Sequence, residues 1–225
     1  MTTPTRSFVD GIGLDGGITE WADLESRSLM VAWATCPRGE WLLQMAARLD
    51  VERKLVVRAA ADCAAFVAPL LTAEPTGERA LASAHGWLTE TTLASECWAA
   101  ATDAAHRADE IEVAEPATAH ALRAVAALAF GCDGAADPAY WASRAYVVEV
   151  GHHVARAYGA ESTRGHRDCA DAVRQHLPFE RISAAMRQAG RGERTSGFHA
   201  VDPATTAALE EAGRPFGRPS KATGT

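Results

Sequence analysis

The fold is decided by residues 36–98, which run CPRGEWLLQMAARLDVERKLVVRAAADCAAFVAPLLTAEPTGERALASAHGWLTETTLASECW. Within this stretch, residues 51–70 repeat apolar side chains at offsets of three, four and seven positions. The repeating positions are Leu55, Val56, Ala59, Cys63, Phe66, Val67 and Leu70. Such offsets place side chains on one face of an α-helix, whereas a half-buried strand would alternate at every second residue. The stretch therefore predicts several amphipathic helices separated by short breaks.

The same periodicity extends along most of the chain, and we expect eight or nine helices. Their approximate ranges are 20–35, 41–49, 51–70, 78–88, 93–109, 116–130, 138–158, 163–176 and 178–189. Asp50 is expected to cap the third of these, Pro69 to stop or kink it, and Gly159 to follow the end of the seventh. The predicted fold is all-α, an irregular multi-helix bundle or a set of stacked helical hairpins.

The composition divides the chain into three parts. Residues 1–17 are rich in Thr, Gly and Asp and predict a flexible N-terminal segment. Residues 18–189 carry the helical periodicity and predict a single helical domain. Residues 190–225 are polar and rich in Gly and Pro, which predicts a mobile tail or one that wraps the domain.

Charge, hydropathy and cysteine content argue against a nucleic-acid-binding protein, a membrane protein and a disulfide-bonded protein. The formal net charge of −7 argues against nucleic acid as a ligand, because binding phosphates requires a basic surface. The N-terminus has no signal-peptide pattern and no apolar run is long enough to cross a bilayer, so we expect a cytoplasmic protein without a membrane partner. The five cysteines form no CxxC motif and are expected to be reduced core residues.

Histidines are the first candidates for chemistry, since imidazole titrates near neutral pH. His85 lies three and four residues from Leu88 and Leu81, on the expected apolar side of its helix, where a core role is the simpler interpretation. His106 lies at helical spacing from Asp103 and from Asp109 or Glu110, with which it could form an acid–base pair, but a solvated charged face is the simpler interpretation. His152 and His153 are adjacent and point about 100° apart on a helix, so they do not face one site together.

No metal site or cofactor is expected from the sequence. His166 and Cys169 lie three residues apart, but a zinc site there would need ligands from another helix, and a semi-buried helical stripe explains the spacing as well. The zincin motif, the phosphate loop, the dinucleotide fingerprint and the nucleophile elbow are all missing from the sequence.

The six tryptophans are candidates for partner or ligand contacts. Tryptophan fills large gaps between helices, and it is also a frequent anchor at protein interfaces. Filling the core is the simpler interpretation for most of them. We select Trp87, Trp98 and Trp141 as candidate contact residues.

Four segments resemble the immunity proteins of the immunity-five-like group, which are alanine-rich helical proteins encoded in bacterial toxin loci, notably in actinobacteria. The segments are CPRGEWLLQMAARL, RAAADCAAFVAPL, TGERALASAHGWLTETTL and CADAVRQHLPFERI, and the resemblance spans residues 29–186. The chain departs from the group at His85, where an acidic residue is usual. It also departs after Trp98, where His106, Asp109, Glu110 and Glu115 interrupt an alanine stretch. The resemblance implies no catalytic residues.

The resemblance implies a protein that binds and neutralises a cognate toxin without catalysis. The alternative is an enzyme or small-molecule-binding protein of a secondary-metabolite pathway built on the same scaffold. In that case His85, His106, His152 or His153 would act as general acid or base in a pocket lined by Trp87, Trp98 or Trp141.

Overall fold

The computed structural model describes residues 2–14, 16–25, 27–49, 51–132, 140–159 and 162–190. Over these residues the chain forms eleven α-helices and one short 3-10 helix, and no strand, which confirms the all-α prediction. The helices are α1 (Pro4–Gly11), α2 (Gly17–Leu24), α3 (Leu29–Thr35), α4 (Gly39–Arg48), α5 (Arg53–Ala65), η1 (Ala68–Leu71), α6 (Pro75–Leu88), α7 (Ala94–Ile111), α8 (Pro116–Phe130), α9 (Tyr140–Ala157), α10 (Thr163–His176) and α11 (Phe179–Gly190). The expected count of eight or nine is too low.

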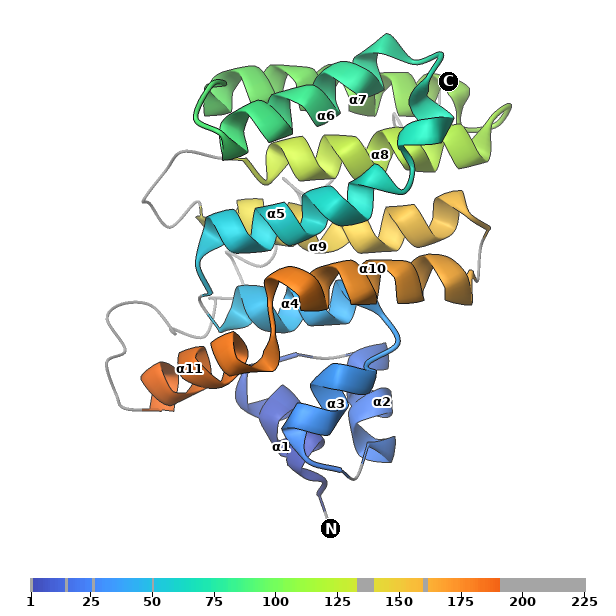
Figure 1. The fold of residues 1–225 in the computed structure, drawn as a ribbon. Helices are drawn as coiled ribbons and strands as arrows, with labels where there is room; N and C mark the ends of the chain where they lie inside the picture. Colours follow the sequence, from blue (N-terminus) through green and yellow to red (C-terminus); the bar gives the residue numbers. More distant parts are fainter. Residues whose placement is uncertain are drawn as a thin grey trace, which may run out of the picture.

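The helices pack in successive layers (Figure 1). At one end of the molecule α6, α7 and α8 pack together, and α8 also packs on α9. Helices α5 and α9 form the middle of the stack, followed by α4 and α10, which contact both of them. Helices α1, α2, α3 and α11 lie at the other end (Figure 1). Helices that are distant in sequence are therefore neighbours in the stack.

Helix α8 is enclosed by its neighbours over most of its length. It contacts α5, α6, α7, α9 and the 3-10 helix. Every residue from Ala124 to Phe130 is buried, as are Ala119, Ala121 and Leu122. A helix that is apolar on all sides belongs in the interior, and its many alanines allow neighbouring helices to approach closely.

Two glycines allow the start of α4 to fit between α9 and α10. A β-carbon on Gly39 would lie 2.5 Å from the β-carbon of Cys169 and 2.7 Å from its carbonyl carbon. On α9, a β-carbon on Gly151 would lie 3.0 Å from the backbone nitrogen of Glu40. Only glycine leaves room for backbones this close.

The strongest periodic segments fold as predicted. Helix α10 has the expected bounds, and α8 ends at the residue before Gly131, as expected. Helix α9 ends at Ala157, and Gly159 follows it in the left-handed region with φ of +119°. The expected start of this helix at Asp137 and Pro138 lies outside the described residues, as does the expected tail over 191–225.

The single helix expected over residues 20–35 is wrong, because it is two helices. Helix α2 ends at Leu24, and the next carboxylate, Glu25, is buried and accepts hydrogen bonds from the backbone and side chain of Arg27. The Ser28 hydroxyl then caps α3 by accepting from the backbone of Val31. These local polar contacts compete with a continuous helix.

The flexible segment expected over residues 1–17 contains helix α1. The Thr3 hydroxyl caps this helix by accepting from the Arg6 backbone, and it donates to the carbonyl of Ala22 in α2. Arg6 pairs with Asp10 four residues on, and Val9 is fully buried. A capping threonine followed by proline is a typical helix start. The Thr, Gly and Asp content of this segment instead predicts a flexible chain.

Helix α5 is shorter than expected. It ends at Ala65, and Pro69 lies in the first turn of the 3-10 helix that follows. The expected cap, Asp50, lies outside the described residues, and the residue before the helix, Glu52, makes no side-chain capping bond. Of the predicted stripe, Ala59, Cys63 and Val67 are fully buried.

Among the helices described, none combines the length and apolar character that crossing a membrane requires.

Candidate functional site

A pair of histidines joins α8 to α9. His120 lies in the second turn of α8 and His153 on the facing side of α9. Their Nδ1 atoms are 3.3 Å apart, and the rings stack with centroids 5.5 Å apart and planes inclined by 28°. Because one nitrogen must donate and the other accept, the hydrogen bond requires at least one neutral imidazole.

The surroundings keep this pair uncharged. Burial lowers the pKa of His153 to about 3, and electrostatic repulsion between its protonated form and His152, His120, Arg123 and Arg156 acts in the same direction. Burial also lowers the pKa of His120 and of His152. The pair is therefore neutral at physiological pH.

A fall in pH should destabilise the protein through His153. Its pKa is about 6.5 when unfolded and about 3 when folded, so the unfolded chain binds the extra proton as pH falls through this window. Between pH 7 and pH 5 we expect the free energy of unfolding to fall by about 2 kcal/mol through this residue. Urea unfolding of wild type and His153→Gln at both pH values measures the effect.

The exposed His85 provides the control for this prediction. His85→Gln removes an exposed imidazole that lies outside the buried pair, so this variant should keep the acid destabilisation of wild type. Equal acid destabilisation in wild type and His153→Gln would show that another group is responsible.

The donors needed for a metal site do not converge on the histidine pair. A structural zinc site takes four ligands, and two imidazoles supply only half of them. Across the described segments, no three His, Cys, Asp or Glu side chains are arranged to hold an ion. His166, which the sequence placed near Cys169, instead donates to the buried carboxylate of Glu40 over 3.1 Å.

The four candidate histidines do not gather at one place. His85 is exposed near the end of α6, so its expected place on the apolar side is wrong. The buried face of α6 runs through Gly77, Ala80, Ala84 and Leu88, and His85 is one position off that line. His106 is exposed on α7, whereas His152 and His153 are half-buried on α9.

His120 was missed by the sequence analysis. Its partner His153 is 33 positions away, and only the way α8 packs on α9 brings the two rings together. No short-range spacing in the sequence indicates such a contact.

Trp98 is exposed at the surface of the described part of the chain. Half of its surface is exposed, and its ring packs edge-on against Phe130 at 4.7 Å and Tyr146 at 6.3 Å between centroids. Phe130 and Tyr146 in turn contact each other at 4.9 Å. We call Trp98, Phe130 and Tyr146 the aromatic cluster. In this cluster two aromatic rings support a third that is half in contact with solvent.

The other two candidate tryptophans are placed differently. Trp87 is half-buried, and the guanidinium of Arg53 lies over its ring at 5.2 Å. This cation–π contact occupies one face of the indole. Trp141 lies in the first turns of α9, where its side chain falls outside the described part.

Comparisons with protein-family models, with curated proteins and with solved structures found no match. The resemblance to immunity proteins therefore stays a prediction.

Proposed function

We propose that this protein binds another protein and neutralises it without catalysis, as an immunity-type protein acting on a cognate toxin in the cytoplasm. The observation that carries the proposal is the exposure of Trp98 within the aromatic cluster. The sequence resemblance supplies the identity of the partner class.

The aromatic cluster has the properties of an interface anchor. Tryptophan is among the residues whose truncation costs most at protein interfaces. An anchor that is already rigid loses little conformational freedom on binding, and two aromatic rings hold Trp98 in place. Leu93, just before the start of the same helix, is also exposed, at 69%.

The acidic excess that favours a basic partner belongs to the chain as a whole, which carries a net charge of −7. Helix α7 carries Glu96, Asp103, Asp109 and Glu110 at exposed positions. Arginines pair with Asp103, Asp109 and Glu110, so the surface is a mixture of charges with an acidic excess across the chain. Such charges speed the encounter with a basic protein more than they raise affinity.

Truncation of Trp98 tests the proposal. Against a toxin encoded in the same locus, we expect Trp98→Ala to weaken binding by at least tenfold, because a central aromatic anchor contributes about 2 kcal/mol or more. Isothermal titration calorimetry measures the affinity, and growth of cells that express both proteins measures neutralisation.

A matched control distinguishes this anchor from apolar exposure in general. Val113 is 98% exposed beyond the other end of α7, so Val113→Ala should bind and protect as well as wild type. Wild-type affinity in Trp98→Ala would reject the aromatic cluster as the contact. Failure of the wild-type protein to bind or neutralise the toxin would reject the function itself.

A further inference from the structure

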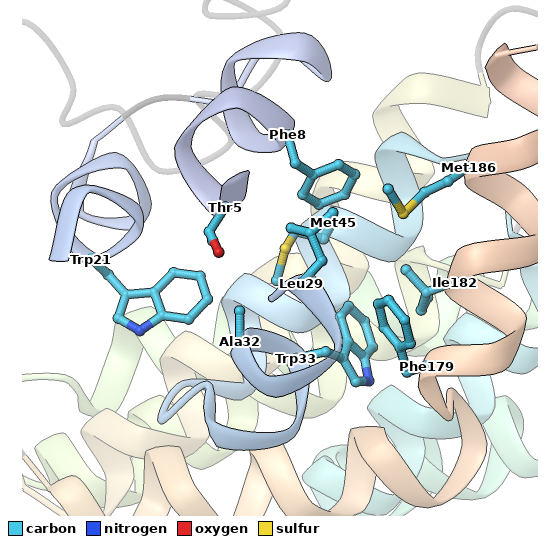
Figure 2. Close-up of a pocket in the computed structure, with 10 residues that line it drawn as sticks. All are labelled: Thr5, Phe8, Trp21, Leu29, Ala32, Trp33, Met45, Phe179, Ile182 and Met186. Atoms are coloured by element: carbon cyan, nitrogen blue, oxygen red, sulfur yellow. The ribbon is translucent and has the colours of Figure 1, made fainter. Parts of the chain in front are cut away.

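An apolar pocket lies between the N-terminal helices and α11. Counted together with the solvent that it opens to, the space among its side chains is about 260 Å3, and its enclosed part has room for about one water molecule. The lining comes from α1, α2, α3, α4 and α11 (Figure 2). Its residues are Thr5, Phe8, Trp21, Leu29, Ala32, Trp33, Met45, Phe179, Ile182 and Met186. None of the candidate histidines is among them.

Thr5 is the one hydroxyl in this lining. The residue is only 1% exposed, and its Oγ1 has no hydrogen-bond partner in the structure. Figure 2 shows the hydroxyl pointing away from α1 into the space beside Trp21 and Ala32. A buried hydroxyl without a partner is destabilising, and native structures rarely keep one without a reason.

We propose that this pocket binds a small uncharged molecule that has an aromatic ring or short alkyl chain and one hydroxyl or carbonyl group. The polar group would hydrogen-bond to Oγ1 of Thr5, and the apolar part would contact the surrounding aromatic and aliphatic side chains. A charged ligand is disfavoured, because no charged side chain in the lining would compensate for its lost hydration. This site is separate from the aromatic cluster and does not depend on the proposed function.

The lining can adapt to such a ligand. Because the enclosed space holds only about one water molecule, a ring can enter only if side chains of the lining move. Two methionines, Met45 and Met186, belong to this lining. Methionine is unbranched and adjusts its shape readily, so these side chains can move to admit a ring. Three of the lining residues belong to α11, and a bound ligand would therefore connect α11 to the N-terminal helices.

Methionine methyl groups give a direct readout of the pocket. The chain has four methionines, two of which line the pocket, while Met30 is 55% exposed and lies outside the lining. With 13C-labelled methionine methyls, NMR titrations with benzyl alcohol and with toluene compare two probes that differ by one hydroxyl. We expect saturable shifts of Met45 and Met186 with both probes and no saturable shift of Met30.

Two substitutions of Thr5 test its assigned contact. Thr5→Val keeps the shape and removes the hydroxyl, so it should weaken benzyl alcohol binding roughly three- to tenfold and leave toluene binding unchanged. Thr5→Ser keeps the hydroxyl and should keep the preference for benzyl alcohol. Without a ligand, Thr5→Val should melt at a higher temperature than wild type, because it removes an unpaired buried group. Thr72→Val, at an exposed threonine, is the control and should change neither affinity.

Three results would overturn the proposal. The first is the lack of a saturable shift of Met45 and Met186 with benzyl alcohol in wild type. The second is an equal loss of affinity for both probes in Thr5→Val, which would indicate that the substitution only changes the shape of the pocket. The third is unchanged binding of both probes in Thr5→Val, which would mean that the hydroxyl makes no contact with the ligand.

Discussion

Replacing Gly39 by alanine is expected to lower the free energy of unfolding by about 3 kcal/mol. The new β-carbon would meet the Cys169 β-carbon at 2.5 Å, its carbonyl carbon at 2.7 Å and the backbone nitrogen of Ala170 at 2.9 Å. Backbone atoms cannot rotate away as the end of a long side chain can. Relief therefore requires α4 and α10 to separate, and the contacts between these helices weaken along their length.

Urea unfolding followed by circular dichroism measures this loss. Gly11→Ala is the matched control, because a β-carbon on Gly11, at the end of α1, meets no atom within 4 Å. This substitution should change stability by no more than about 0.5 kcal/mol, or raise it slightly, since alanine favours helices over glycine. Equal stability of Gly39→Ala and Gly11→Ala would mean that α4 and α10 do not approach as closely as described.

Removing the carboxylate of Glu40 is expected to cost about 3–5 kcal/mol. The residue is 6% exposed, and its two oxygens accept from Arg38 at 2.5 Å and from His166 at 3.1 Å. Burial alone would raise the pKa of Glu40, but the hydrogen bond from His166 and the charges of His166 and Arg38 hold it below its ordinary value. In Glu40→Ala these two partners would remain half-buried without their carboxylate.

Two comparisons separate the buried pair from ordinary surface charge. Glu110→Ala removes an exposed partner of Arg107 and should cost less than about 1 kcal/mol. Because the folded pKa of Glu40 is lowered, its contribution is present at neutral pH and is lost as pH falls through the folded pKa. The stability difference between wild type and Glu40→Ala should therefore shrink in acid. A difference that stays constant into strong acid would contradict the ionic pairing.

The sequence predicts those helices in which an apolar face and a polar face are clearly separated. Helix α10 shows this best, because its apolar face and polar face are sharply separated and its bounds were predicted. Helix α1 and the break between α2 and α3 depend instead on single hydroxyls, those of Thr3 and Ser28. Such caps are too short to produce a periodic pattern.

The candidate sites were harder to predict, because they depend on how helices align with one another. The pairing of His120 with His153 follows from the packing of α8 on α9. The unpartnered state of the Thr5 hydroxyl follows from the convergence of five helices around it. The exposure of Trp98 also depends on how the helices pack. From the sequence alone, an indole on an alanine-rich helix is compatible with burial and with exposure.

The position of α4 between α9 and α10 has a consequence for the order in which the protein can fold. Glu40 and His166, which meet there, are 126 positions apart along the chain. During synthesis the first helices emerge long before α9 and α10 exist to flank them. Closing so large a loop is slow relative to forming local helical contacts. The carboxylate of Glu40 in α4 therefore becomes buried only after the carboxyl-terminal third of the chain has been synthesised and has packed against it.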